Sequence, residues 1–157
     1  LSVLHLDAHS DRRDFYEGSR FNHACVMARV GEMVDTVVSA GIRSMADVER
    51  SQLEGEHVFF AQDCFESDQY VEQIPSLLKD PVYITIDLDV FDSGIMPSTG
   101  TPEPGGLGWY EVIKLLRNVT EKRWVVGFDV VELCPSRNKA PDFLASKLIY
   151  KLLSFIL

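Results

Sequence analysis

Short apolar runs rich in β-branched residues alternate along the chain with segments in which apolar residues recur at helical spacing. We predict strands over residues 1–6, 36–42, 57–61, 81–86 and 124–133, and helices over residues 23–34, 45–53, 67–79, 109–122 and 141–157. Pro75 argues against helix in the second half of 67–79, because a proline removes a helical hydrogen bond. This alternation predicts an α/β fold, in which residues 1–157 form a single three-layer α/β/α domain with a mostly parallel sheet.

Polar clusters follow three of the predicted strands, and open parallel sheets bind ligands beyond the carboxyl ends of their strands. The clusters are Asp7, His9 and Asp11, then Asp87 and Asp89, and finally Glu132. Alternate residues of extended backbone point to one face, so each of the first two clusters can converge on one spot. Carboxylates with an imidazole suit Mn²⁺ and, less specifically, Fe²⁺, Co²⁺ or Mg²⁺, and the charge of the four aspartates balances that of two divalent ions. The simpler alternative is a polar loop whose side chains cap the next helix, which is common for one such cluster but not for three.

Net charge restricts the partners of the chain. Its 157 residues include 24 acidic and 15 basic ones, for a net charge of −9. We therefore expect no nucleic acid and no membrane as partner, since both attract basic faces, whereas a cationic substrate or divalent metals fit. No apolar run approaches the roughly 20 residues that cross a bilayer, and no secretory leader is visible. We expect a cytoplasmic location, with Cys25, Cys64 and Cys134 as buried, reduced thiols. Because Leu1 lies inside a predicted core strand, we also expect the chain to be the C-terminal portion of a longer protein.

Three motifs closely resemble the C-terminal signatures of the ureohydrolase family, which includes arginase and agmatinase. They are "DAHSD" at 7–11, "IDLDVFD" with "STGTPEPGGL" at 86–107, and "GFDVVEL" at 127–133. The resemblance runs from Val3 to the last helix. It implies an arginase-like fold whose N-terminal strands are missing here. It also implies hydrolysis of a guanidino group to urea and an amine, by attack of a metal-bound hydroxide on the guanidinium carbon.

The resemblance further implies a role for each residue of the three clusters. Two Mn²⁺ ions per intact subunit are implied, with Asp7 and Asp87 bridging them, Asp11 binding one ion, and His9 and Asp89 binding the other. His23, in "FNHA", resembles the family's active-site histidine, which shuttles a proton or orients the substrate, and Glu132 matches the carboxylate that holds the guanidinium.

The loop "RRDFYEGSRFNHA" and the segment "TGTPEPGG" look more like agmatinase than arginase, so agmatine leads as the substrate, with other guanidino acids or amines open. Two features depart from the family. Its upstream Gly-Gly-Asp-His motif, which completes one metal's ligands, does not occur in this chain, and Ser93 stands where the family often has proline. The alternatives are a non-catalytic assembly or binding protein on the same fold, and a related metal deacylase. The family also implies trimers or hexamers, and an unprotected sheet edge predicts oligomerisation or poor solubility.

Other polar residues have structural interpretations. We expect His5 to be a satisfied core histidine, and Asp129 to form structural hydrogen bonds, because it faces away from Glu132 on the same strand. The apolar stripe of the last helix predicts core or subunit interface, not a membrane helix: Leu148, Ile149, Leu152, Leu153 and Ile156.

Overall fold

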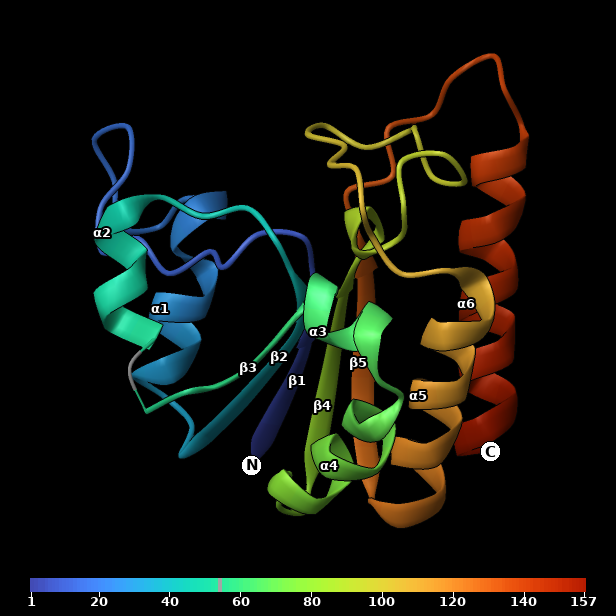
Figure 1. Ribbon diagram of the computed structural model, residues 1–157, viewed down its shortest axis with the longest axis horizontal. Coiled ribbons are helices and arrows are strands. Elements are labelled where there is room, and N and C mark those ends of the chain that lie inside the picture. The colour runs from blue at the N-terminus through green and yellow to red at the C-terminus, as the bar shows by residue number, and fades with distance from the viewer. Residues whose placement is uncertain (54) are drawn as a thin grey trace.

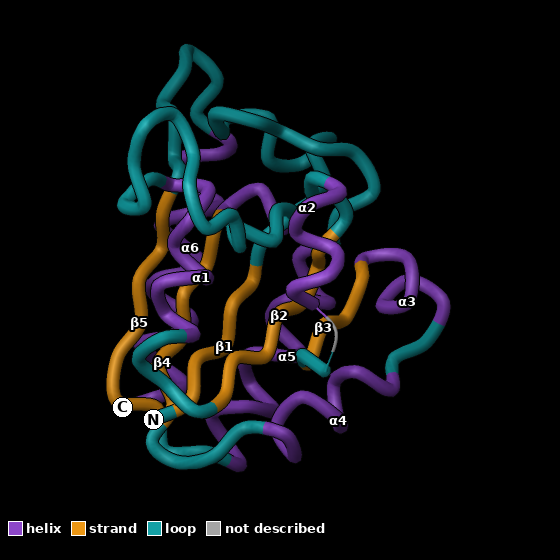
Figure 2. The backbone as a smooth tube through the Cα atoms, turned by 90° about the vertical axis from the view of Figure 1, so that its left-hand side faces the viewer, coloured by secondary structure: helices purple, strands orange, loops and turns teal. Residues whose placement is uncertain are grey.

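A computed structural model describes residues 1–53 and 55–157 of the chain. Five strands form one sheet: β1 (Ser2–Leu6), β2 (Thr36–Ile42), β3 (His57–Phe60), β4 (Val82–Asp87) and β5 (Val125–Val131). All neighbouring strands run parallel, in the order β3-β2-β1-β4-β5 (Figure 2). The predicted α/β fold with a parallel sheet is therefore confirmed.

Helices cover both faces of the sheet, as the three-layer arrangement requires. They are α1 (Val26–Gly31), α2 (Asp47–Arg50), α3 (Ala61–Glu66), α4 (Gln69–Leu77), α5 (Trp109–Lys122) and α6 (Ala140–Ile156). Figure 1 shows α1 and α2 on one side of the sheet and α5 and α6 on the other. No helix among the described residues has the length and apolar character needed to cross a membrane.

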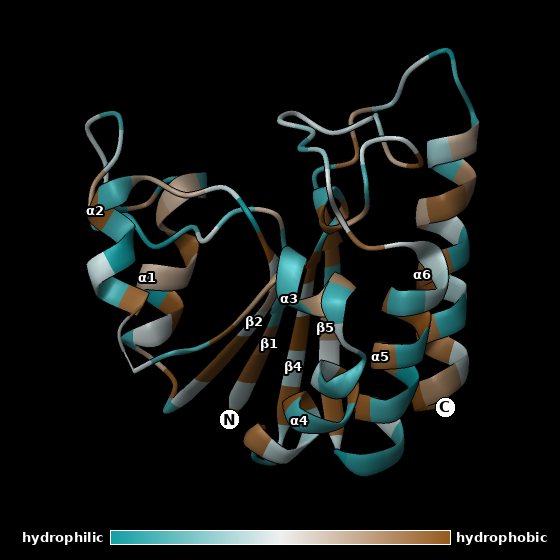
Figure 3. Cartoon of the chain, viewed as in Figure 1, coloured by the Kyte–Doolittle hydropathy of each residue, from teal (hydrophilic) through white to brown (hydrophobic). Residues whose placement is uncertain are grey.

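The alternation of side chains along β1 divides the core into two parts. Leu4 aligns with Val38 of β2 and Ile84 of β4, and all three belong to the large buried cluster that includes residues of α4, α5 and α6. Val3 and its neighbour Val37 instead form a small cluster beneath α1. In Figure 3 the strands are coloured mainly brown, which marks hydrophobic residues. Burying each such side chain contributes about 1.5–3 kcal/mol, so the centre of the sheet is a firm base for the loops at its end.

Helix α4 continues through Pro75 to Leu77, although the sequence argued against helix beyond the proline. The missing N–H of Pro75 leaves the carbonyl of Val71 without its helical donor. Nδ2 of Asn118, on α5, donates to that carbonyl at 2.6 Å. A side chain of the neighbouring helix thus replaces the bond that proline removes.

One other predicted helix differs from the structure, and one observed helix was not predicted. The expected helix over 23–34 is a 3₁₀ turn (His23–Cys25) followed by the short α1, and Cys25, where the turn meets α1, has φ −119° and ψ 1°, outside helical values. α3 was not predicted, because its sequence AQDCFE has only two buried positions, Ala61 and Cys64, and therefore no apolar stripe.

The thiols are free, but only two are buried. Cys25 and Cys64 are buried as expected, whereas Cys134 is exposed. The prediction for Cys134 is wrong because it lies past the end of β5, in a segment (132–140) that is exposed throughout.

β5 forms one edge of the sheet and pairs only with β4 among the described residues. Trp124, Val126 and Val131, on or beside this strand, are exposed. This edge of the sheet therefore presents exposed apolar side chains.

The order of the strands fixes where a ligand can enter. From β1 the chain moves outward to β2 and β3, and then returns to the other side of β1 to form β4 and β5. The loop after β1 therefore leads toward β2, and the loop after β4 leads the other way, toward β5. Where two neighbouring strands continue in opposite directions, a crevice opens between their loops. Asp7 follows β1 directly, and Asp87 is the last residue of β4.

Candidate metal centre

The two aspartate clusters form a turn at each strand end. Oδ1 of Asp7 accepts a hydrogen bond from the backbone N–H of His9 at 2.6 Å. Oδ1 of Asp87 accepts one from the N–H of Asp89 at 2.9 Å. The N–H of Ala8 donates to Oδ1 of Asp89 at 3.0 Å, which joins the two turns. The i, i+2 spacing thus places both clusters against each other across the β1–β4 junction.

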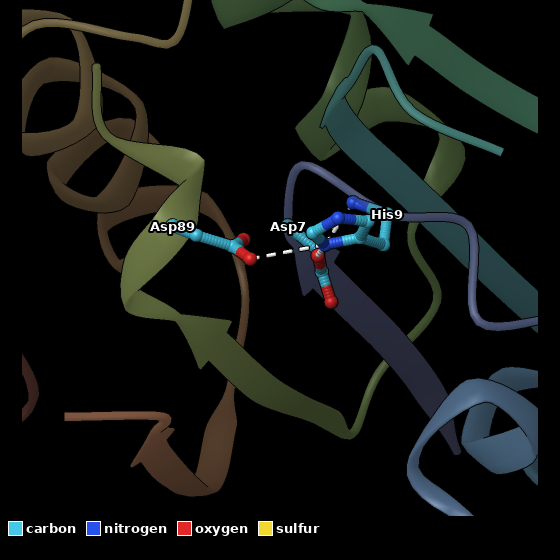
Figure 4. A group of neighbouring side chains, drawn as sticks. All are labelled: Asp7, His9 and Asp89. Carbon is cyan, nitrogen blue, oxygen red and sulfur yellow. Dashed lines mark hydrogen bonds and ion pairs between the residues drawn. The ribbon is translucent and has the colours of Figure 1, made fainter. Parts of the chain in front are cut away.

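Three side chains meet where these turns touch (Figure 4). Nδ1 of His9 lies 3.4 Å from Oδ1 of Asp7 and 3.0 Å from Oδ2 of Asp89. One ligand atom from each residue lies within 4.8 Å of the other two, so the three could hold one metal ion. Asp7 and Asp89 are almost fully buried, and His9 is partly exposed toward the cavity that it lines.

Crowding of buried carboxylates perturbs the acid–base behaviour of the cluster. The contacts with Asp7 and then Asp89 raise the pKa of His9 to about 10. Burial, followed by the charge of Asp7, raises the pKa of Asp11 to about 7, and the same two causes raise the pKa of Asp87. Burial opposes ionisation of Asp7, but hydrogen bonds with His5 and His9 outweigh it and hold the pKa of Asp7 well below its usual value. The site therefore favours positive charge among its carboxylates.

A cavity of about 520 Å³ opens beside this cluster. Six of the seven predicted site residues line it directly: His9, Asp11, His23, Asp87, Asp89 and Glu132. The seventh, Asp7, lies against His9. Asp11 and Glu132 both have left-handed backbone, with φ of 51° and 67°, as is common where a side chain is turned toward a site. A Cβ atom at Gly100 would lie 3.4 Å from Oε2 of Glu132, so this glycine leaves room for the carboxylate.

His5 and Asp129 have the structural contacts that were expected of them. Nε2 of His5 lies 2.9 Å from Oδ2 of Asp7, and its Nδ1 lies 3.2 Å from Oγ of Ser39. Thr85 donates to Asp129 at 2.8 Å on the neighbouring strand. His5 is a satisfied core histidine, and it also fixes the orientation of Asp7.

Several residues of the site were not predicted from the sequence. The guanidinium of Arg13 stacks over the ring of Tyr16, 4.4 Å from its centroid, and Tyr16 meets the His23 ring edge-on at 5.7 Å. Arg43 donates to the backbone carbonyl of Asp89 at 2.6 Å, and to those of Glu103 and Pro104 at 2.8 and 3.0 Å. It thus joins the turn at Asp87–Asp89 to the loop over 103–106. The contacts of Arg43 join segments far apart in the sequence, and no local pattern marks them.

Comparison with known proteins gives consistent results. The model of the arginase family matches residues 1–154. An N(1)-aminopropylagmatine ureohydrolase of Synechocystis sp. is 40% identical over 99% of this chain and 52% of its own length. An agmatinase of Pyrococcus horikoshii is 43% identical over 95% of this chain and 53% of its own. The crystal structure of an agmatine ureohydrolase of Thermoplasma volcanium superimposes with a TM-score of 0.91 at 32% identity, and covers 99% of this chain and 55% of that one. The chain thus spans about half the length of the curated relatives it matches.

Proposed function

The chain belongs to the arginase family, and on that premise we propose that the protein hydrolyses a guanidino compound, with agmatine first, to urea and an amine. The observation that carries the proposal is the meeting of Asp7, His9 and Asp89 at the ends of β1 and β4, beside a cavity lined by the other predicted site residues. The names of the relatives, agmatinase and N(1)-aminopropylagmatine ureohydrolase, support a guanidino substrate.

The donor set fits a pair of Mn²⁺ ions. Four aspartates and one imidazole offer the oxygen-rich mixture that Mn²⁺ accepts. Burial, followed by the charge of Asp7, raises the pKa values of Asp11 and Asp87, and cations among these carboxylates would offset both effects. We propose that Asp7, His9, Asp11, Asp87 and Asp89 would hold the two ions, with Asp7 and Asp87 shared between the Asp11 side and the His9 and Asp89 side of the site. When bound, the two ions supply the positive charge that makes water a nucleophile near neutral pH.

The remaining residues act on the substrate. Glu132, on the rim of the cavity, is a carboxylate that can accept two parallel hydrogen bonds from a planar guanidinium. His23 lines the same cavity with its ring against Tyr16, and we assign it the transfer of a proton or the orientation of the substrate. The excess of acidic groups in the cavity suits a small cationic substrate without a carboxylate.

N(1)-aminopropylagmatine is a second candidate substrate. The relative that is 40% identical is named for it, and its additional amine suits the same acidic cavity. For assembly we propose a homo-oligomer, trimeric or hexameric, and the exposed apolar residues beside β5 support burial of further surface.

Metal-dependent urea release tests the proposal. The chain, and a version extended by any upstream coding sequence, are assayed with Mn²⁺ and with agmatine, N(1)-aminopropylagmatine and arginine in parallel. We expect urea from an amine substrate, about two bound Mn²⁺ per subunit, and loss of both in Asp87→Ala. Asp47→Ala, which removes an exposed aspartate of α2, is the matched control and should leave both unchanged. Absence of metal binding in every version would instead favour a non-catalytic assembly protein.

A further inference from the structure

Glu49 is a buried carboxylate that lines the cavity and contacts the loop after β1. It lies in the short helix α2 and is 3% exposed. Its Oε1 accepts hydrogen bonds from Oγ of Ser10 at 2.5 Å and from the backbone N–H of Arg12 at 2.9 Å. Its Oε2 accepts from the N–H of Ala46 at 2.7 Å and lies 3.6 Å from Nε of Arg13.

Capping of α2 explains only one of these contacts. A glutamate at the third position of a helix commonly accepts a bond from the backbone N–H before the helix, here that of Ala46. The other oxygen of Glu49 has no part in the cap, and it reaches residues 37 and 39 positions away in the sequence. The carboxylate therefore joins α2 to the loop of the proposed metal site.

Ser10 and Arg12, which both donate to Oε1 of Glu49, are the sequence neighbours of Asp11. Asp11 has φ 51°, a conformation that side chains rarely adopt without support from their surroundings. Its carbonyl accepts bonds from the N–H groups of Met27 and Ala28, but within the described residues its carboxylate has no hydrogen-bond donor. The direction of the Asp11 side chain is therefore set by its backbone, and bonds at Ser10 and Arg12 fix that backbone on both sides.

The second oxygen of Glu49 also contacts a residue that lines the cavity. It lies near the guanidinium of Arg13, which stacks on Tyr16, and Tyr16 contacts His23. A single carboxylate thus contacts both the loop of a proposed metal ligand and the row of side chains that ends at the proposed catalytic histidine.

We propose that Glu49 is a positioning residue, which fixes Asp11 for metal binding and holds Arg13 against Tyr16. This inference rests on the proposed function. Residues that orient metal ligands affect affinity although they do not touch the metal, typically by about 10–100-fold.

Glu49→Gln is the sharpest perturbation, because it keeps the size of the side chain and removes its charge. All four groups around the carboxylate are donors, so either orientation of the amide turns its NH₂ toward two of them. Ser10→Ala is a milder variant that removes one contact. Asp47→Asn removes an exposed charge from the same helix and is the control.

The test is a double-mutant cycle with Asp11→Asn. Mn²⁺ affinity is measured by electron paramagnetic resonance of the free ion, and amide hydrogen exchange is followed over residues 8–13. We expect Glu49→Gln to weaken Mn²⁺ binding by about 10–100-fold in the wild-type background and by less than about twofold in Asp11→Asn. Exchange over 8–13 should accelerate selectively, Ser10→Ala should show the same changes more weakly, and Asp47→Asn should show neither.

Each outcome decides one of the two ideas. Equal losses of affinity in both backgrounds, or faster exchange throughout the sheet, would mean that Glu49 acts on general stability and would overturn the inference. Unchanged exchange over 8–13 would also overturn it, whatever the metal does. If Asp11→Asn itself leaves Mn²⁺ affinity unchanged, the proposed ligand set fails, and exchange alone then decides whether Glu49 holds this loop.

Discussion

Asp11→Asn should stabilise the protein when metal is removed. The substitution keeps the left-handed backbone at this position, since asparagine tolerates φ near 51° well, and it breaks no side-chain hydrogen bond within the described residues. What it removes is a charge that burial and Asp7 oppose. The variant therefore measures how much the buried charge of Asp11 lowers the free energy of unfolding of the metal-free protein.

The magnitude follows from the pKa of Asp11, which the fold raises from 3.8 to about 7. A carboxyl with a raised pKa stabilises the fold most below its unfolded pKa, and this contribution is lost as pH rises through the folded value. The wild-type protein therefore loses about 4 kcal/mol between roughly pH 4 and pH 7, at about 1.4 kcal/mol per pH unit. Burial of the neutral asparagine amide offsets part of this. We expect the variant to gain about 2–4 kcal/mol at pH 8 and almost nothing at pH 4.

Urea unfolding in the presence of a chelator, followed by circular dichroism from pH 4 to pH 8, measures the effect. With added Mn²⁺ the wild-type protein should be more stable than Asp11→Asn. It binds the ion more tightly, and binding to the folded state stabilises that state. Asp92→Asn is the control of opposite sign. The N–H groups of Gly94, Gly105 and Gly106 lower the pKa of Asp92, because they stabilise its charged carboxylate. Removal of that charge in Asp92→Asn should therefore destabilise the protein by about 1–2 kcal/mol. A gain for Asp11→Asn that does not depend on pH, or no gain at pH 8, would refute the electrostatic reasoning.

Three further substitutions test other parts of the site. Arg43→Lys should lower kcat at least about tenfold and loosen the loop over 103–106, measured by urea release and hydrogen exchange, because a lysine cannot reproduce the planar fork that binds several carbonyls. Glu132→Gln should raise the KM for the guanidino substrate by about tenfold or more with Mn²⁺ binding unchanged; an unaltered KM would contradict its proposed role. Gly41→Ala should destabilise the fold by about 2–3 kcal/mol in thermal or urea unfolding, since φ is 92° and the new Cβ would lie 2.6 Å from Cγ2 of Val90.

Periodicity was sufficient for the elements whose burial is regular. β2 and α5 occupy the predicted residues, 36–42 and 109–122, because each has an uninterrupted apolar face. Prediction failed where tertiary contacts decide. α4 passes Pro75 where Asn118 of another helix donates to the freed carbonyl, and no window of sequence around the proline contains that information.

The candidate site divides in the same way. Asp7, His9, Asp87 and Asp89 could be predicted to converge because strand ends and alternate spacing are local properties, and the parallel sheet brings them together. The residues that hydrogen-bond to the backbone around these side chains could not be predicted in this way. Glu49 and Arg43 act across 37 and 46 positions of sequence, and an isolated buried charge has no periodic signature.

Capping and metal binding, which the sequence left as alternatives, are compatible in this geometry. Oδ1 of Asp87 accepts a hydrogen bond from the backbone N–H of Asp89, and Oδ1 of Asp89 accepts one from the backbone N–H of Ala8. Each turn therefore uses only one oxygen of its carboxylate. Oδ2 of Asp89 then faces His9, and the carboxylate of Asp87 lines the cavity. A purely structural turn needs only one acceptor from each side chain, and serine or asparagine would supply it without burying charge. Two buried carboxylates at neighbouring strand ends are therefore more than the turns require, and their second oxygens are the groups that a cation would satisfy.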